Sequence, residues 1–375
     1  MKVAIDIRRV RDFGVGTYTY NLIATLARLD SETHYTLAGT GDDWSHLDRL
    51  PDNFSLLEAE PGRALRLAWK LRRQKVQLCH TPYLSTSWVF PCPHVVTVHD
   101  TAEFLDLSGD GGTLADLIRF QRTRLALRRA RRILSVSQAT GRDLQRLFGI
   151  PRDKIEVIYN ALDPRLAHTP PPADQERTLS RYNVNSPYLL YAGNVKPHKN
   201  LPRLIEAFAL VKDELRAHPR YADLKLLIIG DELSQHPQLR RAVIQSRTQQ
   251  DVRFLGFVDA PTLSIFYARA AAFVFPSLHE GFGLPPLEAM AHGTPVVSSN
   301  VSALPEVLGE AALYVNPENV FDISRGIRQL LLDDKLRQWL AEQGRAQVAK
   351  FSWEKSVERV LAVYRETVNR TRPSW

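Results

Sequence analysis

The chain has 375 residues, of which 44% are hydrophobic and 24% are charged. These values are typical of a globular protein with two domains of ordinary size. They exclude a membrane-spanning protein, because no apolar run is long enough to cross a bilayer. The formal net charge of +8 indicates a protein that can attract an anionic partner.

The N-terminal residues and the cysteine content indicate the compartment of the protein. Residues 1–7 indicate a first β-strand and not a signal peptide, because the apolar run is short and Asp6 interrupts it. Two cysteines occur, Cys79 and Cys92. They provide no disulfide framework and their spacing fits no metal site, so we expect a reducing compartment and a cytoplasmic protein.

Two predicted helices carry clustered positive charge. One covers residues 63–75, and its basic residues are expected to form a solvated helix face. The other covers residues 119–132, where arginines are interleaved with apolar residues. Two alternatives stay open for this helix: a solvated face, or peripheral contact with an anionic membrane at its inner surface. The chain has no recognisable nucleic-acid-binding module, so nucleic acid is not an expected partner.

Strand and helix patterns alternate along the first 160 residues, which predicts a parallel sheet with helices on both faces. The first strand leads into Gly14-Val-Gly16, at the kind of strand-to-helix joint where such sheets bind phosphate. Thr19 stands where a dinucleotide fingerprint has its third glycine, so this motif alone is weak.

His99 ends the predicted strand at residues 94–99. Polar residues at the carboxyl end of a parallel strand lie where ligands bind, which makes His99 a candidate catalytic residue. The alternative is a histidine that caps the strand and bonds to Asp100. Three consecutive prolines at residues 170–172 then predict a semi-rigid linker and a domain boundary.

The second half repeats the strand–helix rhythm. A strand at residues 188–192 is followed by Gly193 and Asn194, and then by Lys196 and Lys199. A glycine turn with a lysine predicts a phosphate cradle made of backbone amides and a point charge. The alternative is a solvated loop whose lysines contact nothing.

The most informative stretch is PSLHEGFGLPPLEAMAHGTPVV at residues 276–297, which contains Glu280 and Glu288. It predicts strand, loop, helix and strand, with Pro285 and Pro286 at the first helical positions and Gly293 as the left-handed residue that ends the helix. The helix N-terminus suits a phosphate, and each carboxylate can accept two sugar hydroxyls. A nucleotide-sugar fits these features. The alternative is an ordinary loop with two solvated or dipole-facing glutamates.

With seven residues between them in this setting, the two glutamates resemble the paired-glutamate signature of retaining glycosyltransferases of family 4, which have the GT-B fold. The resemblance implies that Glu280 contacts the donor sugar and that Glu288 holds the ribose hydroxyls. It also implies that the backbone amides of Phe282, Gly283 and Leu284 approach the donor phosphate.

The same resemblance extends to other positions. It places Gly14 and Gly16 at the donor phosphates and His99 at the transferred sugar. The family usually has an arginine directly after Gly193, where this chain has Asn194, and Lys199 matches the family's later lysine. The sequence GNVKPHKN at residues 193–200 resembles a subgroup of mannosyltransferases that build surface polysaccharides, and it is the only indication of the donor.

The expected fold class is α/β, with two Rossmann-like, doubly wound domains of the GT-B fold that face each other across a cleft. Residues 1–168 form the acceptor domain and residues 169–353 the donor domain, while a last helix at residues 354–375 crosses back to the first domain. No Asp-x-Asp motif occurs, so we expect no metal ion and no cofactor. Lysine and helix-end amides would then stabilise the leaving group.

The expected function is that of a retaining, metal-independent hexosyltransferase. It would transfer a hexose, with mannose from GDP-mannose as first choice, from a nucleotide diphosphate sugar to a saccharide or lipid-linked acceptor. The product would be a surface polysaccharide or glycolipid. The alternatives are a UDP-hexose-dependent transferase, another GT-B enzyme such as a phosphorylase or epimerase, and a non-catalytic protein that binds nucleotide-sugars.

Overall fold

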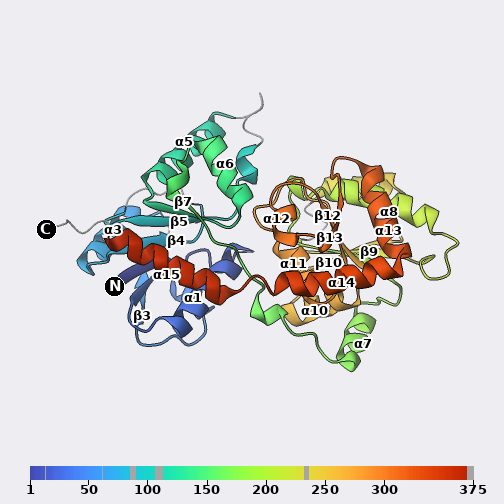
Figure 1. Ribbon diagram of the computed structural model, residues 1–375, viewed down its shortest axis with the longest axis horizontal. Helices are drawn as coiled ribbons and strands as arrows, with labels where there is room; N and C mark the ends of the chain where they lie inside the picture. The colour runs from blue at the N-terminus through green and yellow to red at the C-terminus, as the bar shows by residue number, and fades with distance from the viewer. Residues whose placement is uncertain (13, 61, 85–89, 106–112, 232–235, 370–375) are drawn as a thin grey trace. The chain divides into compact units, whose positions relative to one another are not determined.

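The computed structural model describes residues 1–12, 14–60, 62–84, 90–105, 113–231 and 236–369 (Figure 1). It divides the chain into two compact units, and the chain passes from the first to the second and back. Unit 1 contains residues 1–161 and 352–375, and unit 2 contains residues 162–351. The first division lies seven residues before the boundary expected at 168, and the second lies two residues before the one expected at 353.

Unit 1 is built on a seven-stranded sheet with the order β3-β2-β1-β4-β5-β6-β7, in which all pairs are parallel. The strands are β1 (Lys2–Asp6), β2 (His34–Gly39), β3 (Phe54–Glu58), β4 (Leu78–Thr81), β5 (His94–Val98), β6 (Arg132–Ser135) and β7 (Ile155–Val157). The central strands β4 and β5 are buried throughout. Because the chain order reverses between β1 and β4, the carboxyl ends of these strands border the crevice in which such sheets bind ligands.

Helices connect these strands, and their starts follow from local sequence. They are α1 (Val15–Leu29), α2 (Gly41–Trp44), α3 (Ala64–Arg73), α4 (Ala102–Leu105), α5 (Leu114–Arg129) and α6 (Gln138–Phe148). The Thr113 side chain accepts from Asp116 N, and the Asp116 carboxylate accepts from Thr113 N, which is a capping box that starts α5. Ser137 is the N-cap of α6, and its side chain accepts from Thr140 N.

The last helix, α15 (Trp353–Asn369), belongs to unit 1 although it follows unit 2 in sequence. It packs against α1 and β4, and Figure 1 shows it running beside α1. Trp353, Val357, Val360 and Tyr364 are all buried on this helix. The spacing of three and four residues between them places them on one face, which explains why the helix docks on the unit.

Unit 2 has a six-stranded parallel sheet with the order β10-β9-β8-β11-β12-β13. The strands are β8 (Tyr188–Ala192), β9 (Lys225–Ile229), β10 (Val252–Gly256), β11 (Ala272–Phe275), β12 (Val296–Ser299) and β13 (Ala312–Val315). Both sheets are therefore Rossmann-like, and the α/β fold class is confirmed. In unit 2 the chain order reverses between β8 and β11.

The helices of unit 2 are α7 (Pro172–Arg181), α8 (Leu201–Glu214), α9 (Pro237–Gln245), α10 (Ala260–Arg269), α11 (Leu284–Ala291), α12 (Leu304–Leu308), α13 (Val320–Leu332) and α14 (Asp334–Val348). The prediction that residues 170–172 form a linker is wrong for Pro171 and Pro172, which belong to the start of α7. Pro171 is the N-cap of α7 and Pro172 is its first residue. A proline is favourable there because its missing N–H would have no partner inside the helix.

Candidate functional site

The candidate site of unit 2 lies where the loops that follow β8 and β11 meet. These two strands are neighbours in the sheet, and they flank the point at which the strand order reverses. The loops are bonded to each other, because Leu278 N donates to His198 O at 2.7 Å and Asn200 Nδ2 donates to Pro276 O at 3.0 Å. The carboxyl ends of strands at such a reversal are the usual ligand position in this kind of sheet.

Lys199 and Glu280 form an ion pair in this position. Lys199 Nζ lies 2.6 Å from Glu280 Oε1, and the two side chains are only 13% and 10% exposed. Lys199 Nζ also lies 5.5 Å from the centre of the Phe275 ring. The ammonium group has three N–H donors, so a lysine that bonds to Glu280 can also bond to a ligand oxygen.

The backbone of Glu280 is hydrogen-bonded to the loop that precedes α12. Its backbone N–H donates to Ser302 Oγ at 3.2 Å, and Ser302 Oγ donates to Glu280 O at 2.5 Å. These bonds hold both the N–H and the C=O of Glu280, and its carboxylate remains directed at Lys199. Neither Ser302 nor the Lys199–Glu280 pairing was predicted from the sequence, in which these residues are widely separated.

The predicted phosphate cradle after β8 is partly occupied by the protein itself. Gly193 N donates to Ile229 O at 3.0 Å, and Val195 N donates to Asp231 Oδ2 at 2.7 Å. These two amides are therefore not free for a phosphate. Asn194 is half-buried, and its carbonyl oxygen accepts from the Tyr191 hydroxyl at 3.1 Å.

The loops after β8 and β9 approach each other at a pair of glycines. A Cβ added to Gly230, which has a φ of 150°, would lie 2.0 Å from Gly193 O. Only glycine allows this contact. Asp231, which directly follows Gly230, orders the neighbouring loop through Val195 N. The sequence analysis missed this aspartate, although a Gly-Asp pair at the end of a predicted strand was a signal that could have identified it.

The start of α11 provides fewer amides than a helix N-terminus usually does. Two of its first three residues, Pro285 and Pro286, have no N–H. With Gly283 as the N-cap, the N–H groups of Gly283 and Leu284 are the ones left without a partner inside the helix. Gly283 is the N-cap with a φ of 101°, and a Cβ there would lie 2.6 Å from Leu304 Cδ2. Phe282 is 4% exposed and packs edge-on against Phe351, so only its backbone can reach a ligand.

Glu288 lies on α11 and shares a hydrogen bond with a buried tyrosine. The Tyr267 hydroxyl donates to Glu288 Oε2 at 2.7 Å, while Glu288 Oε1 has no hydrogen-bond partner among the described residues. Loss of hydration raises the pKa of Glu288 from 4.5 to about 7, against the opposing effect of the Tyr267 bond, and the negative charge of Asp163 adds to the rise. The carboxyl group is therefore close to half ionised at neutral pH.

Unit 1 contains the other predicted residues. Gly14 is the exposed N-cap of α1. Gly16 is needed for packing, since a Cβ there would lie 2.2 Å from Val10 O. The structure therefore explains Gly16 without a ligand, and its predicted role at the donor phosphates stays a prediction. These glycines and His99 belong to unit 1, whereas Lys199, Glu280 and Glu288 belong to unit 2.

His99 is half-buried at the carboxyl end of β5. His99 Nε2 donates to Pro82 O at 2.9 Å, and the ring packs edge-on against Tyr18 with centroids 4.8 Å apart. Burial lowers the pKa of His99, so the ring is neutral at pH 7 with its proton on Nε2 and with Nδ1 as an acceptor. The alternative bond to Asp100 is not formed, because Asp100 Oδ1 accepts from Ala102 N at 3.1 Å.

A buried hydrogen-bond chain connects α15 to the tyrosine beside His99. The Tyr364 hydroxyl and His80 Nδ1 lie 2.5 Å apart, His80 Nε2 and Thr97 Oγ1 lie 2.8 Å apart, and Thr97 Oγ1 and the Tyr18 hydroxyl lie 3.2 Å apart. Burial lowers the pKa of His80 to about 3, which keeps the ring neutral. No motif in the sequence indicated this chain, because its members come from four different elements.

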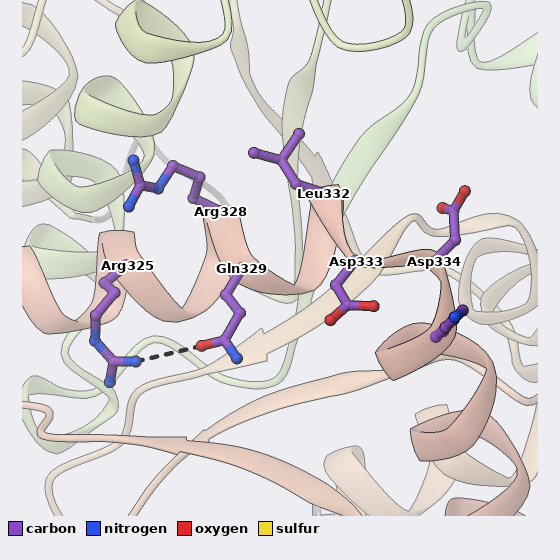
Figure 2. Close-up of a pocket in the computed structure, with 7 residues that line it drawn as sticks. Arg325, Arg328, Gln329, Leu332, Asp333 and Asp334 are labelled. Atoms are coloured by element: carbon purple, nitrogen blue, oxygen red, sulfur yellow. Dashed lines mark hydrogen bonds between the residues drawn. The ribbon is translucent and has the colours of Figure 1, made fainter.

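A hollow of about 660 Å³ between α13 and α14 does not coincide with the candidate site. Its lining residues are Arg325, Arg328, Gln329, Leu332, Asp333, Asp334 and Lys335. Figure 2 shows the Arg325 and Arg328 side chains extending in opposite directions from α13, with Arg325 bonded to Gln329. Both arginines form ion pairs, with Asp322 at 2.6 Å and with Glu214 at 3.3 Å. None of the predicted site residues lines this hollow.

Within the described part of the chain, no group of three or more His, Cys, Asp and Glu side chains could hold a metal ion. Among the same residues, no helix combines the length and the hydropathy needed to cross a bilayer.

Two family descriptions match the sequence. "Glycosyltransferase Family 4" matches residues 14–166, and "Glycosyl transferases group 1" matches residues 174–347. The chain is 35% identical over 312 residues to the O-antigen chain mannosyltransferase B of Escherichia coli. This alignment covers 80% of this chain and 77% of that protein. It is 34% identical over 227 residues to a serotype-specific mannosyltransferase of Escherichia coli, covering 60% of this chain and 27% of that longer protein.

Solved structures share the fold. A sucrose-phosphate synthase from Thermosynechococcus elongatus superposes with a TM-score of 0.78 at 21% identity, covering 99% of this chain and 100% of that chain. At this identity the likeness concerns the fold alone, and it matches the two Rossmann-like sheets described above.

Proposed function

The chain belongs to the glycosyltransferases of group 1 and family 4, which have the GT-B fold, and from this premise we propose that it is a retaining mannosyltransferase. Its donor is GDP-mannose, and its acceptor is a saccharide or a lipid-linked saccharide of a surface polysaccharide. The O-antigen mannosyltransferase that aligns with 80% of the chain supports this choice of sugar and product. The observation that carries the proposal is the Lys199–Glu280 ion pair at the strand reversal of unit 2.

In this proposal Lys199 serves the diphosphate and Glu280 serves the sugar. Their contact at 2.6 Å places a positive charge and an acceptor of sugar hydroxyls beside each other, where the sugar–phosphate bond of a donor would lie. The ammonium group keeps donors for the leaving phosphate while it remains bonded to Glu280. In a half-buried site such a fixed charge stabilises the departing diphosphate more than it would in water.

Glu288 would hold the nucleotide through the ribose. Its Oε2 is already bonded to Tyr267, which leaves Oε1 to accept from ribose hydroxyls. The N–H groups at the start of α11 that have no partner inside the helix, on Gly283 and Leu284, suit the phosphate next to that ribose. No metal ion is part of this proposal, because the lysine and the helix amides supply the positive field.

We also propose that unit 1 contacts an anionic membrane through α5. On this helix Leu114, Leu117 and Ile118 are 74%, 55% and 49% exposed, and arginines follow them from Arg119 onward. A solvated helix face would not be expected to expose three large aliphatic side chains in its first five residues. Exposed apolar residues beside arginines are typical of helices that lie on anionic lipid, which is where a lipid-linked acceptor would be found.

The function is tested by calorimetric binding of GDP, UDP and ADP, followed by turnover of the matching nucleotide-mannose with and without a saccharide acceptor. We expect GDP to bind at least tenfold more tightly than UDP, which corresponds to about 1.4 kcal/mol. Tighter binding of UDP would reject GDP-mannose and leave a UDP-hexose transferase. Binding of a nucleotide-sugar without any turnover would reject the enzyme assignment.

A further inference from the structure

The two cysteines of the chain lie against each other in unit 1. Cys79 Sγ and Cys92 Sγ are 3.2 Å apart, and both are free thiols. An S–S bond is about 2.05 Å long, so a movement of little more than 1 Å would join them. Cys79 is buried within β4, and Cys92 precedes β5 by two residues.

The backbone fixes this approach. β4 and β5 are paired in parallel with Cys79 opposite His94, and Cys79 N donates to Pro93 O at 2.9 Å. Pro93 directly follows Cys92 and restricts the backbone of the residue before it. The two sulfur atoms therefore meet because of strand register, and a change of one side-chain rotamer is not required to bring them together.

Solvent reaches one of the two thiols and not the other. Cys92 is half-buried and lines a cavity of about 320 Å³, which has further walls from Phe90, Pro93, His94, Ala126, Arg129 and Arg131. Cys79 is 3% exposed. The hydrogen bond with Cys92, together with burial, raises the pKa of the Cys79 thiol. Cys92 is therefore the thiol that a small oxidant can reach from solvent.

We propose that Cys79 and Cys92 form a peroxide-sensitive dithiol site that closes to an intramolecular disulfide. The Cys92 thiolate attacks one oxygen of hydrogen peroxide, the O–O bond breaks, and Cys92 becomes a sulfenic acid while hydroxide leaves and takes up a proton as water. Cys79 then gives up its proton and attacks the Cys92 sulfur, forming the S–S bond and releasing a second water. Two electrons pass from the two thiols to the peroxide, and a small thiol restores the pair by exchange.

The test uses the full-length protein, reduced, freed of reductant and treated with increasing hydrogen peroxide. Samples are denatured in N-ethylmaleimide and their intact mass is measured. We expect a monomer that has lost two hydrogen atoms and carries no maleimide, and treatment with dithiothreitol before alkylation should give two maleimides. Because the chain has only two cysteines, this mass has one interpretation.

Two variants separate the steps. In Cys79→Ala, Cys92 should become a sulfenic acid that dimedone traps, and in Cys92→Ser the buried Cys79 should remain a thiol at the same peroxide dose. The proposal is overturned if the wild-type protein still takes two maleimides at a dose that converts Cys92 in the Cys79→Ala variant. A covalent dimer, or gain of oxygen without loss of hydrogen, would also overturn it. If either variant fails to fold, the wild-type series decides the question, because two maleimides at every peroxide dose would overturn the proposal.

Discussion

Replacing Glu288 by glutamine is expected to stabilise the ligand-free protein, and to do so increasingly as the pH rises. Glutamine has the size of a protonated glutamate and can still accept the hydrogen bond from the Tyr267 hydroxyl. It cannot ionise, so it removes the cost of a charge in a poorly hydrated position. A stabilising substitution at a predicted binding residue would indicate that the wild-type residue is retained for function.

The magnitude follows from the pKa of Glu288, which is about 7 in the folded protein and 4.5 when the group is fully hydrated. A raised carboxyl pKa means that the folded state binds the proton more tightly than the unfolded state does. The contribution of this group to stability is therefore fully present below pH 4.5 and is lost as the pH rises through 7. With about 1.4 kcal/mol for each pKa unit, the loss approaches roughly 3 kcal/mol at pH 8.5 and is roughly 1 kcal/mol at pH 5.

The assay is urea unfolding of the wild-type protein and the Glu288→Gln variant at pH 5 and pH 8.5, followed by far-ultraviolet circular dichroism. The exposed Glu318 provides a matched control as Glu318→Gln. We expect the gain in unfolding free energy for Glu288→Gln to be about 2 kcal/mol larger at pH 8.5 than at pH 5, with no such difference for the control. An equal gain at both pH values, or a loss at pH 8.5, would refute the reasoning.

Further predictions concern the ligand, the ion pair, the metal and the membrane. The affinity of the wild-type protein for GDP should fall roughly tenfold from pH 8 to pH 6, because the ionised fraction of Glu288 falls by about that factor around a pKa near 7. In calorimetry, the Glu288→Gln variant should bind GDP more weakly and with an affinity that does not follow this titration. Lys199→Ala should lower the turnover of every accepted donor sugar alike. The control Lys355→Ala removes an exposed charge on α15 and should leave turnover unchanged. Equal turnover in both variants would reject the role of Lys199. Turnover should persist in EDTA, and its complete loss would show that a metal ion is required. Sedimentation with anionic vesicles should weaken in salt and in the double variant Leu117→Ser, Ile118→Ser, and absence of binding at low salt would return α5 to a solvated helix face.

The alternation of strands and helices was predictable because local signals determine it. The prolines at the start of α11 and the glycine after it each act within a few residues, and each was placed correctly. The triple proline was misassigned because a proline is equally suited to an extended linker and to the first turn of a helix. Only the residues that follow, which form α7, distinguish the two.

The contacts within the candidate site were less predictable, because they depend on which strands become neighbours. Lys199 and Glu280 were identified separately from the sequence and were assigned to different parts of the donor. Their ion pair arises because β8 lies beside β11, which a sequence does not state. Asp231 was missed for the same reason, since its role depends on the approach of Gly230 to the preceding loop. The roles of His99, Gly14 and Gly16 in donor binding stay predictions.

The discontinuity of unit 1 also has a consequence for how the protein is synthesised. The ribosome completes β1–β7 first, but α15, which covers α1 and β4, is translated about 190 residues later. At roughly 5–20 residues per second this delay is about 10–40 s. During that time the surface that will receive Trp353, Val357 and Tyr364 has no covering helix, whereas unit 2 is contiguous and can fold as it emerges. A nascent chain stalled before residue 352 should therefore expose an apolar surface on unit 1 that chaperones can bind.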